Sequence, residues 1–396
     1  MALDSSAFAT NFTGELDKII TDKSAVGFLE DNAFKAKFVG AKTVKVPNIA
    51  LQGLGSYDRD NGFTKGTLNI SNTAYTMTQD RSRSFNIDRE DLDETGIAEL
   101  AGEVLGEFVR TKVVPEIDAY TLSKLYQVAE DNGSIIYDYS LEKPFKSFIE
   151  LADEVQRKVG MDEEIICFMS RYFWNLLRKS EEFSKVLDIS HMKKGEITLE
   201  VNKIDNIRII PVSETRMQTA FNFGDGSGNT EGGFTPKDDA SQIYMLMCPK
   251  KAISLVKKSE KIRIFTPDQN IDCDAYKFDY RIYYDAFVKS DLAESIYAIK
   301  EPSLSIDNDL PSTLAVQSGE SESIYVTLNY NDTFDIGFQW YSCDDENGSH
   351  PKRLRGSNES SFYISSELEA GDYYYYVTVT CASKVIRSNI VKVTVS

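Results

Sequence analysis

Two strand-like runs joined by a glycine-rich stretch are the feature that most constrains this chain. The segments AKTVKVPNIALQGL and TLNISNTAYTMTQDRSRSFNI each predict a strand of roughly ten residues. Between them, GLGSYDRDNGFTKG carries four glycines and an Asn-Gly turn pair, which indicates a long hairpin. Both faces are too polar for a core, and two isolated strands are only marginally stable in water. We therefore expect the hairpin to lie on another surface.

The second run places two arginines on its apolar side. With a period of two, Arg81 and Arg83 share one face with Met77, Phe85 and Ile87. An unpaired buried charge is costly, so each arginine needs a partner. This face is predicted to meet another surface.

A long helix is predicted after the hairpin. DREDLDET, at 88–95, is typical of a helix start, because acidic side chains are favourable at the positive end of the helix dipole. Apolar residues then recur at three- and four-residue steps as far as Ala129, with Pro115 as the expected kink. The predicted helix has about 36 residues and a length on the order of 54 Å, enough to form a spine.

The next region predicts an α/β domain. PFKSFIELADEVQRKVG and RYFWNLLRKS indicate helices, with the buried strand EIICFMS between them. Further strand-like runs follow, and KFDYRIYYDAFVKS alternates strictly, so it is expected to return to the spine helix and close the first domain.

Overall composition predicts a soluble two-domain protein made in the cytosol. The chain has 396 residues, of which 41% are hydrophobic, and neither a leader-like start nor a long apolar run. Its 62 acidic and 44 basic residues give a net charge of -18. That balance argues against binding nucleic acid by neutralising phosphates.

Motifs typical of catalysis, phosphate binding or metal binding are weak throughout the sequence. His191 and His350 are the two histidines and are expected to be solvated. GDGSGNTEGG lacks the ending of a phosphate-binding loop, and its twelfth calcium-ligand position is Pro236, so a hairpin tip is favoured. The five cysteines are interpreted as small buried hydrophobes. We therefore expect no catalytic residues, no cofactor and no metal, and the protein is predicted not to be an enzyme.

The last 90 or so residues predict an all-β sandwich, because short strands recur at regular spacing after the proline-containing linker KEPSLSIDNDLPS. Alternation places Tyr373 and Tyr375 inside. The residues expected outside are Gln339, Tyr341, Tyr374 and Tyr376. Such a patch suits sugar rings or a protein partner, and an idle sheet face is the alternative.

Four segments resemble, in order and spacing, the major capsid proteins of tailed bacteriophages with the fold named after phage Hong Kong 97. They are KTVKVPNIALQGLGSYDRDNGFTKG, TMTQDRSRSFNIDREDLDET, GEFVRTKVVPEIDAY and KFDYRIYYDAFVKSDLAESIY. The resemblance implies an α+β capsid domain at 1–300. Its parts would be an N-arm (1–40), an E-loop hairpin (41–82), a P domain with the spine helix (83–131 and 271–300) and an A domain (132–270).

The C-terminal part, 301–396 with a linker at about 300–313, resembles bacterial immunoglobulin-like (Ig-like) domains. FQWYS supplies the core Trp340, and EAGDYYYYVTV supplies the penultimate strand with a tyrosine corner near Tyr373. The usual inter-sheet cysteine pair is absent, and Cys343 and Cys381 have opposite parity, so no bond between them is expected.

The resemblance implies a self-assembling icosahedral shell of hexamers and pentamers that encloses double-stranded DNA without specific binding. The shell would be assembled in the bacterial host cytoplasm and located in the virion, with a scaffolding protein, a portal and a decoration protein as expected partners. The Ig-like domain would be displayed outside, where it could bind host-surface or mucus glycans. A separate scaffold or an already processed start is implied by the arm beginning at Met1, and no crosslink through Lys65 is predicted.

In that family the E-loop lies across the adjacent subunit. Arg81 and Arg83 are therefore expected to face carboxylates near the head of a neighbouring spine helix, namely Asp88, Glu90, Asp91 or Asp93. Two alternatives stay open: a surface-binding module, such as an adhesin or tail-associated protein with an Ig-like domain, and an enzyme with an appended binding domain. Assembly into closed shells would favour the capsid hypothesis, whereas small oligomers would favour the surface-binding module.

Overall fold

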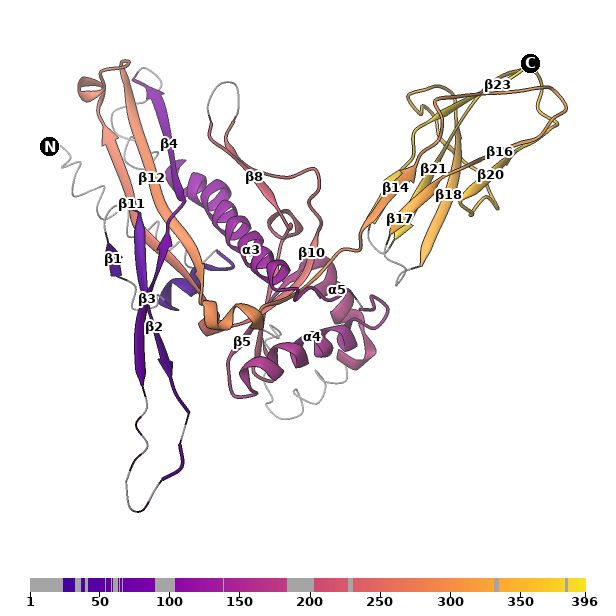
Figure 1. Cartoon of the computed structure of the whole chain (residues 1–396). Coiled ribbons are helices and arrows are strands. Elements are labelled where there is room, and N and C mark those ends of the chain that lie inside the picture. Colours follow the sequence, from indigo (N-terminus) through magenta and orange to yellow (C-terminus); the bar gives the residue numbers. More distant parts are fainter. Residues whose placement is uncertain are drawn as a thin grey trace, which may run out of the picture.

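The computed structural model describes residues 24–32, 37–39, 42–53, 55–57, 59, 63, 65, 67–89, 104–137, 139–183, 203–226, 231–330, 335–381 and 384–396. Figure 1 shows the C-terminal strands as a separate body, joined by one connection to a larger part of mixed helices and sheets. The predicted class, α+β followed by an all-β sandwich, is confirmed.

The predicted hairpin is present and leaves the rest of the molecule (Figure 1). Strands β2 (Thr43–Leu51) and β3 (Leu68–Thr76) pair antiparallel along their whole length, and β1 (Lys37–Val39) adds to the outer side of β2. The base of the hairpin is anchored in a core. There a small cluster packs together, made of Val44, Met77, Val256, Tyr283 and Phe287.

The run that follows β3 belongs to a different sheet. Strand β4 (Gln79–Asp88) is the edge of a three-stranded antiparallel sheet of order β11-β12-β4, with β11 at Ile253–Phe265 and β12 at Ala275–Val288. The chain therefore changes sheets at Met77 and Thr78. Phe85 and Ile87 face the large core, as the alternation predicted, because this face of β4 lies toward the long helix.

That helix is regular at 104–108, widens to a π-helix, η2, at Val109–Val113, and continues as α3 at Val114–Asp131. The widened turn ends at Val113, two residues before Pro115. The Val114 amide donates to the carbonyl of Val109, five residues back. Proline lacks an N–H and its ring clashes with the carbonyl four residues earlier, and a π turn is one way for a helix to accommodate both. The expected start at 90–103 lies outside the described residues.

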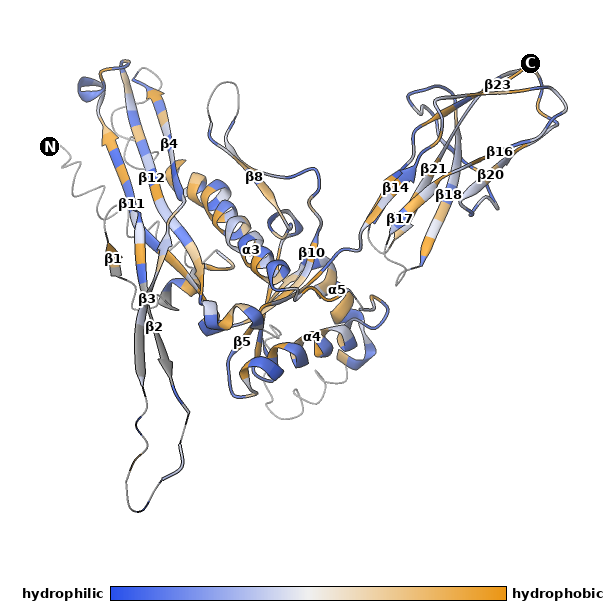
Figure 2. Ribbon diagram, in the orientation of Figure 1, coloured by the Kyte–Doolittle hydropathy of each residue, from blue (hydrophilic) through white to orange (hydrophobic). Residues whose placement is uncertain are grey.

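A second body of sheet and helices follows. The mixed sheet has the order β13-β10-β5-β7-β6. Its strands are β5 (Ile165–Ser170), β6 (Lys203–Ile204), β7 (Ile207–Val212), β10 (Ile243–Pro249) and β13 (Tyr297–Lys300). Helix α4 (Pro144–Val159) buries its apolar stripe on this sheet and leaves a hydrophilic face outside (Figure 2). Helix α5 (Arg171–Lys179) starts at Ser170, whose hydroxyl accepts from the Phe173 amide at 3.2 Å.

Short elements complete the first part. A two-stranded hairpin consists of β8 (Phe221–Gly224) and β9 (Gly233–Pro236), so the glycine-rich stretch forms a hairpin tip, as predicted, although 227–230 lie outside the described residues. The 3-10 helices are η1 (Gly27–Asn32), η3 (Glu214–Arg216), η4 (Lys250–Ala252), η5 (Pro267–Gln269) and η6 (Ser290–Ser295).

The C-terminal body is all β. One sheet has the order β15-β23-β21-β18-β19 with β22 beside β21, and two pairs, β14-β17 and β16-β20, form the other side. The bounds are β14 (Leu304–Asn308), β15 (Thr313–Val316), β16 (Glu322–Tyr325), β17 (Thr327–Tyr330), β18 (Ile336–Cys343), β19 (Lys352–Arg353), β20 (Ser361–Ile364), β21 (Gly371–Cys381), β22 (Lys384–Arg387) and β23 (Val391–Val395).

Two signature contacts support the Ig-like description. Trp340 is fully buried and its indole N–H donates to the Glu359 carbonyl at 2.8 Å. The Tyr373 hydroxyl donates back to the Glu369 carbonyl at 3.1 Å, which is the contact expected of a tyrosine corner. Two expectations were wrong. Tyr376 is buried because Tyr341 and Arg387 cover its ring, and Cys273 is exposed because it lies in the turn between β11 and β12.

Candidate assembly and surface sites

Arg81 has its partner within the chain. Its guanidinium contacts Glu116 of α3 through Nε at 2.5 Å and Nη2 at 3.2 Å, and Nη2 also donates to the Gly233 carbonyl at 3.3 Å. Burial alone would lower the pKa of Arg81, but the hydrogen bond to Glu116 and its charge outweigh burial and raise that pKa. One side chain thus joins strand β4, helix α3 and the β8-β9 hairpin.

Arg83 lies beside the turn of the same hairpin. A Cβ on Gly226 would come within 3.1 Å of Arg83 Nη1, and Gly226 has a φ of +73°, so this position requires glycine. The Arg83 side chain is exposed in the single chain. Of its expected partners on another subunit, Asp88 is exposed at the end of β4, and Glu90, Asp91 and Asp93 lie outside the described residues. Pairing between subunits stays a prediction.

A buried carboxylate fixes the point where the hairpin leaves the body. Asp285 is fully buried on β12 and accepts from the Thr78 amide at 2.8 Å, the Tyr120 hydroxyl at 2.8 Å and the Lys124 ammonium at 2.5 Å. Thr78 Oγ1 also donates to it at 3.1 Å. Because Thr78 lies between β3 and β4, Asp285 ties the hairpin's origin to α3 and the sheet.

A second buried carboxylate, Asp118 on α3, holds the first described residues. It accepts from Ser24 Oγ at 2.5 Å, from the amides of Ala25 and Val26, and from Arg216 Nη1 at 2.9 Å. Burial raises the pKa of Asp118, while these donors act in the opposite direction. The carboxylate therefore connects an N-terminal segment, the long helix and η3.

Sequence reasoning missed Glu116, Asp118 and Asp285. A usable signal was present for two of them. Asp118 lies four residues after Val114 and four before Leu122, in an apolar helical stripe, and Asp285 lies within the strand-like run YYDAF. A carboxylate on an apolar stripe predicts a buried partner. The identity of that partner depends on which elements the fold brings together.

The predicted patch on the Ig-like domain is a packed ladder. The Tyr341 and Tyr376 rings stack with centroids 5.1 Å apart and planes at 10°, and the Arg387 guanidinium lies 4.1 Å from the Tyr376 ring. Gln339 donates to the carbonyls of Trp340 and Leu354 and accepts from Arg353. Tyr374 is half-buried beside Lys392 on the same face.

Two strongly exposed aromatic side chains of this domain lie on the opposite strands. Tyr363 on β20 is 72% exposed and Tyr325 on β16 is 54% exposed. Their partners across the ladder are Ser323 and Ser361, respectively, so the two tyrosines share one face. The sequence pattern gave no reason to prefer these tyrosines over the YYYY run.

No catalytic or metal-binding site is evident in the part of the chain that the structure describes. Those residues contain no group of three or more His, Cys, Asp or Glu side chains that could hold a metal ion. His350 is exposed and its Nδ1 lies 3.2 Å from Asp344, while His191 lies outside the described residues. No helix among the described residues is long and apolar enough to cross a membrane.

Comparison with known proteins gives matches among solved structures. No protein-family model matches, and no curated protein matches. The chain is similar to the mature capsid of bacteriophage PhiM1 (14% identity, 66% of this chain and 82% of that one, TM-score 0.42). It is also similar to the capsid of Cyanophage P-SCSP1u (12%, 67% and 84%, TM-score 0.44) and to tandem Ig repeats of Dlar (13%, 37% and 81%, TM-score 0.19). These similarities are low in both sequence and superposition.

Proposed function

We propose that this chain is the major capsid protein of a tailed bacteriophage, and that copies assemble as hexamers and pentamers into an icosahedral shell enclosing double-stranded DNA. The observation that carries the proposal is the β2-β3 hairpin. It extends away from the body (Figure 1). Tyr57 and Phe63, which lie between its strands in the sequence, are 62% and 89% exposed. Their rings pack edge to face with centroids 5.3 Å apart.

An exposed aromatic pair on a projecting hairpin is suited to docking. Burying one such side chain contributes roughly 1.5–3 kcal/mol, and two isolated strands gain little from their own packing. A second copy of the chain is the partner we propose. Every copy then contributes one hairpin and receives another, and a contact of this head-to-tail kind can close into rings.

The remaining parts fit a structural role. Asp285 and Arg81 fix the hairpin's origin to a rigid helix and sheet, so its direction is set before assembly. The net charge of -18 suits a wall that encloses DNA without gripping it. The proposal includes the N-arm, E-loop, P and A divisions given above, a location in the virion, assembly in the host cytoplasm and no catalytic activity.

The partners we propose follow from the same role. Besides itself, the chain would meet a scaffolding protein, a portal and a decoration protein. The Ig-like domain would lie on the outer surface and present two tyrosine-bearing faces, of which the one with Tyr325 and Tyr363 is open to a glycan. Both faces would be tested, since the ladder of Tyr341 and Tyr376 is packed and Tyr325 and Tyr363 are open.

The test is assembly with and without the aromatic pair. We would express the chain with its flanking genes and examine extracts by electron microscopy. The wild type should give closed shells, and Tyr57→Ser with Phe63→Ser should give unassembled subunits with unchanged thermal stability. Tyr363→Ser, on the C-terminal domain, is the matched control and should assemble normally.

Two outcomes would count against these proposals. Shells of normal yield from the double variant would contradict the docking role of the hairpin aromatics, although not the shell function itself. Small oligomers alone from the wild type, with every flanking gene present, would favour the surface-binding module instead.

A further inference from the structure

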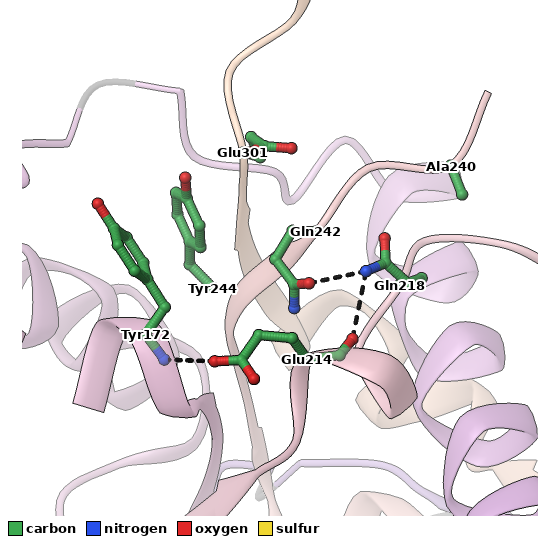
Figure 3. A pocket seen from close by; sticks show the side chains of 7 residues that line it. All are labelled: Tyr172, Glu214, Gln218, Ala240, Gln242, Tyr244 and Glu301. Atoms are coloured by element: carbon green, nitrogen blue, oxygen red, sulfur yellow. Dashed lines mark hydrogen bonds between the residues drawn. The ribbon is translucent and has the colours of Figure 1, made fainter. Parts of the chain in front are cut away.

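A cavity of about 340 Å³ lies where the connection to the C-terminal domain begins. It is lined by side chains from α5, from η3, from the segment before β10, from β10 itself and from the first residue after β13. The lining residues are Tyr172, Glu214, Gln218, Ala240, Gln242, Tyr244 and Glu301 (Figure 3). Nothing in the proposed shell function uses this cavity.

The two glutamines present acceptors and no spare donors. Gln218 Nε2 donates to the Glu214 carbonyl at 3.2 Å and to Gln242 Oε1 at 2.7 Å. Gln242 Nε2 donates to the carbonyls of Met217 at 2.8 Å and Ile243 at 3.1 Å. Each amide has two N–H groups, so both are consumed. Gln218 Oε1 takes part in none of these hydrogen bonds, and in Figure 3 it points away from the Glu214 carbonyl.

The lining is also negatively charged. Among the lining residues that the structure describes, two are carboxylates, Glu214 and Glu301, and none is a lysine, arginine or histidine. Glu214 Oε1 accepts from the Tyr172 amide at 2.8 Å, which fixes that carboxylate at the start of α5. Burial raises the pKa of Tyr172 and the charge of Glu301 raises it further, so this phenol stays neutral.

Aromatic rings form one wall. The Tyr172 and Tyr244 rings lie 5.6 Å apart with planes at 31°, and their hydroxyls point the same way in Figure 3. Tyrosine faces attract cations through the ring quadrupole. Carboxylates, an amide oxygen and aromatic rings together favour a ligand that is cationic and donates several hydrogen bonds.

We propose that this cavity binds a primary ammonium group, either from a small diamine or from a lysine of a second copy. An ammonium carries three N–H donors and one charge, which matches the acceptors present. A divalent metal ion prefers more oxygen ligands than two carboxylates supply. The Glu301 amide already donates to the Gln242 carbonyl at 2.7 Å. An ammonium bound by the Glu214 and Glu301 carboxylates would further link η3 to the connection that leads to the C-terminal domain.

The first experiment uses the full-length unassembled chain and putrescine as the probe, measured by isothermal titration calorimetry. The wild type should bind putrescine at one site per chain, and Glu214→Gln and Glu301→Gln should each weaken binding at least tenfold. Glu320→Gln removes the same charge from an exposed turn of the C-terminal domain and should bind as the wild type does. Should Glu214→Gln fail to fold, Glu301→Gln carries the test.

The second experiment distinguishes the two sources of the ammonium group. Shells assembled from mixed ¹⁴N- and ¹⁵N-labelled chains would be treated with a carbodiimide, which couples carboxylates to contacting amines. Peptides linking Glu214 or Glu301 of one isotope to a lysine of the other would identify a neighbouring copy. Their absence, with putrescine binding intact, would identify the small amine.

Three results would overturn the proposal. They are the absence of both putrescine binding and crosslinks, equal binding by the wild type and both pocket variants, and tighter binding of Ca²⁺ than of putrescine. The titration needs no assembled particle. Failure of the shell function would therefore leave the titration interpretable, and the two proposals fail separately.

Discussion

Arg81 on strand β4 and Glu116 on helix α3 form a two-point ion pair, with N–O contacts of 2.5 and 3.2 Å. The two side chains are 23% and 12% exposed, so water screens the pair weakly. Through the Gly233 carbonyl the same guanidinium also holds the β8-β9 hairpin. Strand β4, which follows the projecting hairpin in the chain, is thereby fixed to helix α3.

Arg81→Ala is expected to lower the free energy of unfolding by about 2 kcal/mol, because it leaves a mostly buried carboxylate without its partner. The matched control is Arg110→Ala. Arg110 pairs with Glu107, and both side chains are 57% exposed, so this change should lower the free energy of unfolding by less than about 0.5 kcal/mol. Urea unfolding of the unassembled chain measures both. Equal effects would show that the buried pair has no special role.

Asp285→Asn is expected to loosen the origin of the hairpin. The change removes the charge that pairs with Lys124 and turns one acceptor into a donor, at a cost of about 3 kcal/mol. The Thr78 amide should then exchange its hydrogen much faster, while amides of β5 remain protected. Asp279→Asn is the control, because Asp279 is only half-buried and accepts from the Ser84 hydroxyl. Unchanged exchange at Thr78 would contradict the anchoring role.

Thiol reactivity should separate one cysteine from the other four. Cys273 is exposed, whereas burial raises the pKa of Cys248 to about 12 and raises the pKa of Cys167, Cys343 and Cys381 as well. In mildly alkaline buffer, Ellman's reagent should therefore label one thiol per native chain and all five in guanidinium chloride. Cys273→Ser should abolish the fast native reaction, and a persisting fast thiol would refute this burial pattern.

Acid should remove the contribution of Asp80 to stability. Arg281 donates to its carboxylate at 2.8 and 2.6 Å, and these hydrogen bonds lower the pKa of Asp80 below its ordinary 3.8. A lowered carboxyl pKa contributes stability that is present above 3.8 and is lost as the pH falls through the lowered value. The pair is half exposed, so the contribution is at most about 1 kcal/mol.

The measurement compares wild type with Asp80→Asn over a range of pH. The wild type should be more stable at neutral pH, and the difference should shrink on acidification below the ordinary pKa of aspartate. Added salt should shrink it at neutral pH as well. A difference that stays constant with pH would mean that the carboxylate charge does not contribute.

The sequence by itself determined the local elements. Alternation and turn residues specify the hairpin β2-β3 and the strands around Trp340, because side-chain period and turn geometry depend on neighbours in the chain. The three- and four-residue spacing specifies α3 for the same reason. Those patterns also gave the correct side of β4 for Phe85 and Ile87.

Only the tertiary structure decided what covers each face. Arg81 meets Glu116, a residue 35 positions away, because β4 pairs with β12 and lies against α3. Parity placed Tyr376 on the outer face of its sheet, and yet the ring is 6% exposed since Tyr341 and Arg387 lie on adjacent strands. Period two fixes the direction of a side chain, whereas its burial depends on neighbouring strands that are distant in sequence.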